Sequence, residues 1–314
     1  MDLSSMLSLI QTAAELGLIS SLTVLSLFLS YSMLNVCDLS TDGCFTLGAA
    51  VGSMVAISGQ GHPFLSIPIA MLAGVISGFI TAFLQTKMGI DSLLSGIIVN
   101  TGLYSINIAV MKNNSLVNLA GKETVFTKVK TLLSGTPFEA QNKLIVAAAA
   151  VILVVLFLAL FLKTNLGLAI RATGNNPDMV RSSSINTAKI TIIGLSISNA
   201  ITALSGCLLA QSQKSANIDI GTGMVTIALA SLLIGGILFS KRKNISVRAV
   251  CSVFGALIFR FVYTAALRFN MPAYMLKLVS SVIVIVAISA PYLKTKIPML
   301  KRRMELRSKK EVLQ

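Results

Sequence analysis

Three aspartates are the charged residues best placed to do chemistry in this apolar sequence. Asp38, Asp42 and Asp219 lie beside Gly-rich stretches, near the expected starts of short helices. Carboxylates in such positions can line a path for a substrate or an ion, with the N-termini of broken helices directed at it. Together with Ser40 and Thr222, they can instead cap the helices through hydrogen bonds to free backbone N–H groups. Both interpretations stay open, because a capped half-helix can still line a cavity.

Amide and hydroxyl side chains form a second candidate lining. Asn100, Tyr104 and Asn107 are spaced by four and three residues, so they share one face of an expected helix over 92–111. Amides that face lipid are costly, so this face should meet protein or water. It can line a pore, or it can form hydrogen bonds between helices. A second expected helix repeats the theme with Ser198, Asn199, Thr202 and Ser205.

The sequence offers no set of residues typical of a catalytic or metal centre. His62 is the only histidine, and the four cysteines (Cys37, Cys44, Cys207 and Cys251) lack the spacing of metal ligands. The G-x-x-x-x-G-K-[ST] motif that binds nucleotide phosphates is also absent. We therefore expect neither an enzyme nor a metalloprotein, and any ATPase activity would belong to a separate subunit.

A polar, basic segment, residues 163–189, separates two apolar stretches. Loops of this length are usually ordered by a function, such as binding a partner. The run from Gly174 to Pro177 favours a turn followed by a helix start. We predict a short helix over about residues 178–186 that lies along the membrane surface, a shape suited to passing force from a soluble motor to the membrane helices. The residues expected to contact this soluble partner are Arg171, Gly174, Asn175, Asn176, Asp178, Val180, Arg181 and Ile185.

The composition is that of an integral membrane protein. Of the 314 residues, 54% are hydrophobic and 12% are charged, against about 25% charged residues in soluble domains. Most of the nine apolar stretches are long enough to cross a bilayer core of about 30 Å, and the short, Gly-rich second one favours a broken helix. We predict an all-α, multipass membrane protein with spans near 16–36, 43–57, 64–86, 92–111, 144–162, 190–210, 223–240, 245–268 and 275–293.

The net charge of +15 is distributed as membrane topology requires, and not as a nucleic-acid-binding surface. With residues 163–189 in the cytoplasm, seventeen Lys and Arg residues fall inside and seven outside, in agreement with the positive-inside rule. This arrangement places the N-terminus outside and the C-terminus inside. The basic tail, residues 294–314, is expected to bind anionic membrane lipid, with no nucleic-acid partner.

The chain repeats with an offset of 181 residues. Asp38-Leu39-Ser40-Thr41 aligns with Asp219-Ile220-Gly221-Thr222, and the same offset maps spans of the first half onto spans of the second half. One connecting span between two sets of four gives the halves opposite orientation, which suits alternating access to a path. The expected organisation is an outer amphipathic helix (1–15), then a transmembrane domain (16–293), then the tail. The domain divides into a first repeat (16–111), an external loop (112–143), a connecting helix (144–162), a coupling loop (163–189) and a second repeat (190–293).

Two pairs of glycines predict close contacts between helices. Gly48 and Gly52, and likewise Gly74 and Gly78, are four residues apart. In membranes this spacing lets neighbouring backbones approach each other closely. We expect these faces to pack against other helices of the chain.

Several motifs, in order along the chain, resemble a known transporter family. The run Gly167, Arg171, Ala172, Gly174, Asn175, followed by Ile185, Lys189, Ser205 and Gly206, resembles the coupling segment of bacterial ABC importer permeases of the branched-chain amino-acid/ribose class. Residues 38–51 and 93–111 resemble one branch of that class, which is paired with binding proteins for tryptophan and tyrosine. The resemblance extends over nearly the whole chain.

This resemblance implies the permease subunit of an ATP-driven importer in the bacterial cytoplasmic membrane. Two copies, expected as a homodimer, would surround a central path, and each would bind an ATP-binding-cassette ATPase that carries ATP and Mg. An extracellular substrate-binding lipoprotein would deliver the solute. The branch favours tryptophan or tyrosine as substrate, while other amino acids, nucleosides and sugars stay open. The path residues are expected to be Asp38, Ser40, Asp42, Asn100, Tyr104, Asn107, Asn199, Thr202 and Asp219.

A different class of protein fits part of the same pattern. An ion-coupled secondary transporter also uses inverted repeats, and its ion would bind at Asp38, Asp42 or Asp219. A self-sufficient transporter has no need of the long segment at 163–189, which favours the ATP-driven importer.

Overall fold

The computed structural model describes residues 3–59, 62–135, 139–238, 244–267, 278–286 and 289. Within these ranges, seven helices are long and apolar enough to cross a membrane, and a shorter apolar helix covers Met224–Ile237. The predicted all-α, multipass class is therefore confirmed. Residues 278–286 of the predicted ninth span are helical, whereas the rest of that span and the basic tail lie outside the described residues, apart from residue 289.

The helices follow the predicted spans closely, and their bounds are as follows. Helix α1 (Leu3–Leu27) continues into a π-helical turn (Phe28–Met33) and is followed by α2 (Thr41–Ser58), α3 (Ser66–Lys87), α4 (Ser92–Val110), α5 (Val125–Leu132), α6 (Asn142–Phe161), α7 (Asn165–Asn175), α8 (Pro177–Ser182), α9 (Thr187–Gln213), α10 (Met224–Leu238) and α11 (Ile245–Leu267). Short 3-10 turns cover Pro63–Leu65 and Glu139–Gln141. Residues 3–15 are continuous with α1 and do not form a separate helix, so their location on the outer surface stays a prediction.

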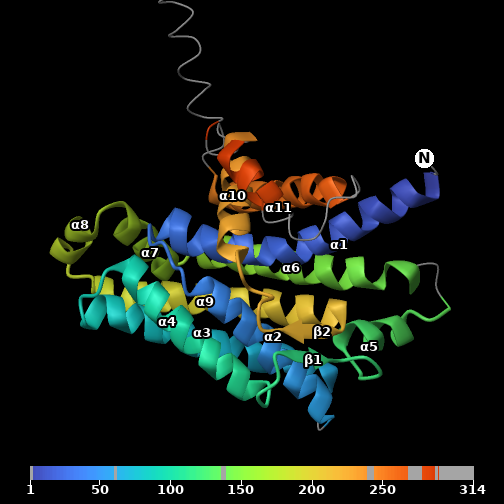
Figure 1. Cartoon of the computed structure of the whole chain (residues 1–314). Helices are drawn as coiled ribbons and strands as arrows, with labels where there is room; N and C mark the ends of the chain where they lie inside the picture. Colours follow the sequence, from blue (N-terminus) through green and yellow to red (C-terminus); the bar gives the residue numbers. More distant parts are fainter. Residues whose placement is uncertain are drawn as a thin grey trace, which may run out of the picture.

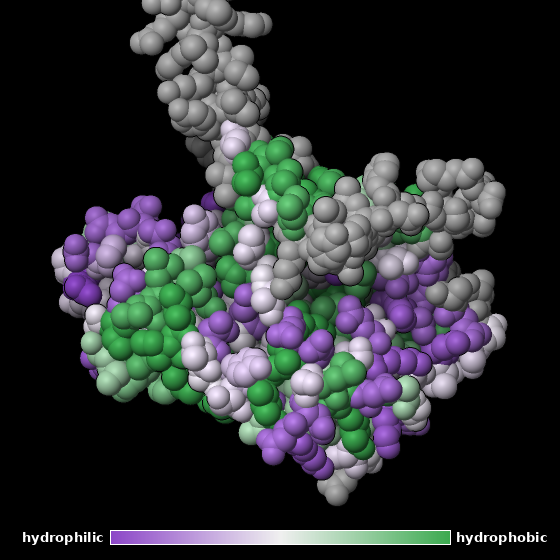
Figure 2. Space-filling model, in the orientation of Figure 1, coloured by the Kyte–Doolittle hydropathy of each residue, from purple (hydrophilic) through white to green (hydrophobic). Residues whose placement is uncertain are grey.

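The two ends of the bundle carry different structures (Figure 1). Helices α7 and α8 lie at one end, and the strands and α5 lie at the other, where α1 also begins. Figure 2 shows hydrophilic residues over both ends and hydrophobic residues over α4 between them. The start of the chain and the predicted coupling segment thus lie at opposite ends, as predicted, while the side of the membrane that each faces stays a prediction.

Helix α9 forms the centre of the bundle and packs against α1, α2 and α3. The predicted glycine pairs face this helix: a side chain at Gly48 or Gly52 would collide with Ala203 or Cys207, and one at Gly74 would collide with the carbonyl of Asn199. Packing at such close range stabilises membrane helices where lipid removes the hydrophobic driving force between them.

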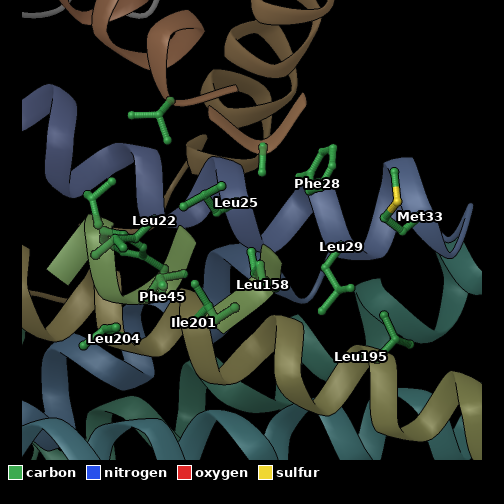
Figure 3. Packing of buried hydrophobic residues seen from close by; sticks show 14 of the residues in the cluster. Leu22, Leu25, Phe28, Leu29, Met33, Phe45, Leu158, Leu195, Ile201 and Leu204 are labelled. Atoms are coloured by element: carbon green, nitrogen blue, oxygen red, sulfur yellow. The ribbon is translucent and has the colours of Figure 1, made fainter. Parts of the chain in front are cut away.

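The core between α1 and α9 combines apolar packing with hydroxyl contacts. Figure 3 shows Leu22 and Leu25 of α1, and Leu29 of the π-helical turn that follows it, beside Ile201 and Leu204 of α9; all of them are buried. Hydroxyl side chains also form hydrogen bonds between the same two helices. Thr23 Oγ1 donates to Ser205 Oγ at 2.9 Å, and Ser198 Oγ donates to the carbonyl of Ser26 at 2.8 Å.

These bonds also reveal the relation between the halves. Because residue numbers rise along α1 while their partners' numbers fall along α9, the two helices are antiparallel. The offset of 181 residues maps α1 onto α9, α2 onto α10 and α3 onto α11, within a few residues at each end. Opposite direction of equivalent helices is what the predicted inverted repeat requires.

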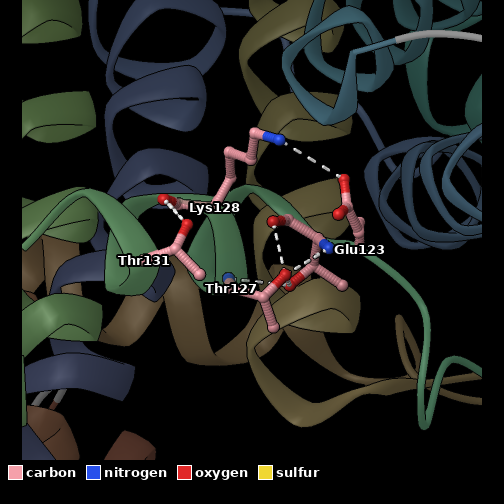
Figure 4. Close-up of polar contacts among 5 residues, drawn as sticks. Glu123, Thr127, Lys128 and Thr131 are labelled. Carbon is pink, nitrogen blue, oxygen red and sulfur yellow. Dashed lines mark hydrogen bonds and ion pairs between the residues drawn. The ribbon is translucent and has the colours of Figure 1, made fainter. Parts of the chain in front are cut away.

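The predicted external loop contains ordered structure. Strand β1 (Leu116–Asn118) pairs antiparallel with β2 (Ser215–Asn217). Helix α5 begins with a capping box, in which Thr124 and Thr127 exchange hydrogen bonds, and Glu123 and Lys128 form an ion pair of 3.6 Å (Figure 4). Gln211 of α9 accepts the Val125 N–H at 3.0 Å, so this loop is attached to the central helix.

Candidate functional site

Asp42, in the first turn of α2, links this helix to the start of α10. Its Oδ2 accepts a hydrogen bond from the Gly223 N–H at 2.9 Å, and its Oδ1 accepts one from the Val225 N–H at 2.8 Å. A residue in the first turn of α2 therefore caps α10, which satisfies donors that a helix start leaves free. Asp42 and Gly223 are 181 residues apart, so they are also equivalent positions of the two repeats.

Five of the predicted path residues line one cavity of about 370 Å³ beside this junction. They are Asp42, Asn100, Tyr104, Asn107 and Asp219. Hydroxyl groups complete much of the remaining wall, from Thr46, Thr101, Ser105 and Thr222. The predicted common face of α4 thus meets α2 and the loop before α10, and nine of the eleven lining residues have polar side chains.

Asn107 is the most buried polar residue of this wall. It is 1% exposed, and its Nδ2 donates to the carbonyl of Gly43 at 3.1 Å. Its Oδ1 has no hydrogen-bond partner among the described residues. Tyr104, one turn away on α4, is 52% exposed. The wall therefore runs from a buried amide to an exposed phenol.

Asp219 lies in the segment between β2 and α10, and it does not cap α10. Its backbone N–H donates to Asn217 Oδ1 at 3.2 Å, while its carboxylate has no hydrogen bond or ion pair among the described residues. The capping interpretation is therefore wrong for this residue, because Asp42 already occupies the N-terminus of α10.

The other predicted path residues are buried outside the cavity. Asp38 Oδ1 accepts from the Ser40 N–H at 2.8 Å and from Ser40 Oγ at 2.6 Å, and its Oδ2 accepts from Asn199 Nδ2 at 2.9 Å. Thr81 of α3, a residue that the sequence did not single out, donates to Ser40 Oγ at 3.1 Å. Thr202 contacts Ser26 within the α1–α9 core. These residues tie the segment before α2 to α3 and α9.

Ser40 occupies the N-cap position of α2, but its side chain makes no cap bond. Asp38 binds the Ser40 N–H, which lies one residue before the helix. The predicted capping of α2 by these side chains is thus wrong, although both residues do order the chain that leads into α2.

The predicted coupling segment is more helical than a loop. Its short helix is α8, Pro177–Ser182, and the Asn176 side chain caps it by accepting the N–H groups of Asp178 and Met179, each at 3.1 Å. The predicted range, 178–186, was too long at its C-terminal end, because Ser184 adopts a positive φ of 61° and Asn186 already caps α9.

Gly174 and Asn175 belong to the last turn of α7 and not to a turn between helices. Gly174 packs against the backbone of Met33 and Leu34, at the end of the first span, so closely that a side chain would collide with the Met33 carbonyl. The glycine is therefore required by a close approach of backbones, while the predicted turn lies one residue further along, at the α7–α8 junction.

Most of the predicted contact residues are accessible, with one exception. Asn175, Asn176, Asp178, Arg181 and Ile185 are exposed, and Arg171 is half-buried. Val180 is 1% exposed and anchors α8 to the protein, so it cannot form a contact surface. The exposed apolar residue of α8 is its neighbour Met179, which is 56% exposed and which the sequence did not single out.

A hollow of about 780 Å³ adjoins α7 and α8, and it is basic. Arg171, Met179, Asn35 and Arg248 are among the residues that line it. Arg248, from the start of α11, donates to Ser32 Oγ at 2.9 Å and lies over the Phe28 ring at 5.9 Å. In the sequence, Arg248 is only one of the seventeen basic residues assigned to the cytoplasmic side. Its place in this hollow depends on tertiary structure.

Comparisons with known proteins agree over almost the whole length. The family model for the branched-chain amino acid transport system / permease component matches residues 9–288. A tyrosine transport system permease protein of Clostridioides difficile (strain R20291) is 32% identical over 300 residues, which is 95% of this chain and 97% of that protein. The ribose import permease protein RbsC of Escherichia coli (strain K12) is 28% identical over 255 residues, or 80% of this chain and 75% of that protein.

A probable branched-chain amino acid transport permease protein, LivH of Methanocaldococcus jannaschii, is 27% identical over 265 residues, which cover 74% of this chain and 79% of that protein. No solved structure matches the chain. The family match includes the cavity and the α7–α8 segment alike. The chain therefore belongs to the permease-component family of branched-chain amino acid transport systems and is a multipass membrane permease.

Proposed function

We propose that the chain is the permease subunit of an ATP-driven importer that carries an aromatic amino acid, tyrosine or tryptophan, across the bacterial cell membrane. Family membership supports the transport role. The full-length similarity to a tyrosine transport system permease supports the aromatic substrate. Within the structure, one observation supports the ATP-driven mechanism: α8 has an exposed side, at Met179, and a side that is anchored to the protein by the buried Val180.

Helix α8 is suited to pass movement from a bound ATPase to the membrane helices. Met179 and its exposed neighbours are free to contact a partner, while Val180 is buried. Gly174 rests on the end of the first span, and only four residues separate the end of α8 from the start of α9, the central helix. A push on α8 would thus reach α1 and α9 directly.

The basic hollow beside α8 indicates what kind of surface would bind there. Arg171 and Arg248 line it, and Arg171 has no ion pair among the described residues. Guanidinium groups bind carboxylates with two parallel hydrogen bonds. An acidic side chain of the ATPase, which would also carry ATP and Mg, fits this hollow. In this account α8 and the C-terminus face the cytoplasm, and the N-terminus faces outward.

A second copy of the chain is expected to close the cavity on its open side. Thr101, Tyr104 and Ser105 of α4 are exposed although they lie within a membrane-spanning helix. Polar groups in contact with lipid are costly, so such residues normally face protein or a water-filled space. A homodimer that meets across α4 would place these residues along a central path, to which an external substrate-binding lipoprotein would deliver the solute.

Uptake by the assembled transporter tests the substrate. Proteoliposomes would contain this chain with its ATPase and its binding protein, and would receive ATP on the ATPase side. Accumulation of labelled tyrosine or tryptophan, with weak competition from leucine and ribose, is the expected result. Accumulation of leucine or ribose in preference to both aromatic amino acids would contradict the proposed substrate.

A further inference from the structure

We propose that the cavity between α2, α4 and α10 binds the amino group of the transported solute, with Asp219 and Asn107 as its acceptors. This inference rests on the proposed function, because it names the part of an amino acid that the permease itself recognises.

The wall has a net negative charge. Two carboxylates, Asp42 and Asp219, line the cavity, and none of the described residues that line it is basic. Asp42 is already satisfied by the backbone N–H groups of Gly223 and Val225. Asp219 therefore supplies a carboxylate that is free to bind a cation.

A second, independent acceptor is buried in the same wall. Asn107 Oδ1 has no partner among the described residues, although Asn107 is 1% exposed. The bond from its Nδ2 to the Gly43 carbonyl fixes which end of the amide is left without a partner. A buried acceptor without a donor is unfavourable, so a ligand N–H group that reaches this atom would be favoured there.

Among solute groups, a primary ammonium fits these acceptors well. It carries a positive charge for Asp219 and three donors, which leaves donors for a second acceptor. The exposed ring of Tyr104 borders the same cavity and can hold a cation over its face. A carboxylate or phosphate at this position would instead meet a like charge and no basic partner.

The chain contains no tryptophan, which provides a direct assay. Indole fluorescence in a sample of the full-length chain in detergent comes only from an added probe. Titration would compare L-tryptophan, tryptamine, which keeps the ammonium group, and N-acetyl-L-tryptophan, which lacks it. Saturable binding of the first two is expected, with binding of the third weaker by about tenfold or more.

Variants test the assignment to Asp219. D219N is expected to weaken binding of L-tryptophan and tryptamine by about tenfold, and D219E, which keeps the charge, should largely restore it. Asp219 is exposed, so these changes should not unfold the protein. E123Q is the matched control, since it removes an exposed carboxylate that does not line the cavity; its binding should equal that of the unchanged chain.

Three results would overturn the site: equal binding of N-acetyl-L-tryptophan and tryptamine, unchanged binding by D219N, or no saturable binding of any probe. These results are separable from failure of the proposed function. ATP-driven uptake of tyrosine together with any of them would remove the site and leave the importer. Asp219-dependent binding without ATP-driven uptake would keep the site and remove the importer.

Discussion

The carboxylate of Asp42 connects two helices whose positions in the sequence are far apart. It lies in α2, binds the first N–H groups of α10, and lines the cavity at the same time. Both of its oxygens are used by backbone donors, so its charge is balanced by the helix start. The residue thus holds the wall of the cavity in place, while Asp219 is left available to a ligand.

Removal of the Asp42 carboxylate should therefore destabilise the protein more than removal of an ordinary cap. We predict that D42A lowers the free energy of unfolding by about 1–3 kcal/mol, whereas D42N, which keeps an acceptor, has a smaller effect. The matched control is D91A, which removes a single, exposed cap bond from α4 and should cost about 1 kcal/mol or less. Thermal unfolding in detergent provides the comparison, and equal midpoints for D42A and D91A would contradict the role of Asp42.

The segment of α7 and α8 is closely packed on the side that meets the core and exposed on the side that meets solvent. Close packing at Gly174 sets its distance from α1, and the buried Val180 sets the rotation of α8. Two different substitutions can therefore separate the structural side of this element from its contact side.

The two neighbouring residues of α8 should respond differently to a charge. M179D places a carboxylate at a site that is 56% exposed, so the unfolding midpoint should stay the same while copurification of the ATPase is lost. V180D buries an unpaired charge, which is strongly unfavourable, so it should lower the unfolding midpoint itself. If M179D retained the ATPase fully, the contact surface assigned to α8 would be wrong.

Gly174 should be essential for transport because no side chain fits at this position. In G174V the new side chain meets the Met33 carbonyl and would push α7 away from the first span, so ATP-driven uptake should fall severely in protein that is still inserted. The control is G236V in α10, where nothing lies within 4 Å of the added carbon and where only the helix-propensity change remains. Similar uptake by the two variants would show that the contact at Gly174 has no role in coupling.

Some features of these elements could be predicted from the sequence because they depend on local spacing. Asn100, Tyr104 and Asn107 face one cavity because helical periodicity places them together, and Asn176 followed by Pro177 marks the start of α8. The orientation of Val180 was missed, since a helix of 6 residues has too few positions to define an apolar face. The bond from Asp42 to α10 spans 181 residues, and only the fold brings such positions into contact.

In the whole molecule, two inverted halves place a polar cavity beside α4, and we propose that a second copy closes its open side. We predict that S105C, on the exposed face of α4, is joined to the same residue of a second copy by a thiol-reactive cross-linker with a short spacer. L153C on the exposed face of α6 is the control and should give no such product. Cross-linking of L153C but not S105C would place the second copy elsewhere.

The energy source of transport separates an ATP-driven permease from an ion-coupled transporter. Uptake of the amino acid would be measured in proteoliposomes with the chain alone under an ion gradient, and with the chain, its ATPase and its binding protein under ATP without a gradient. The account predicts accumulation only in the second case, and it predicts that D38N and D42N remain largely active there, since asparagine keeps an acceptor at both sites. Accumulation by the chain alone under an ion gradient, abolished by D38N or D42N, would contradict it.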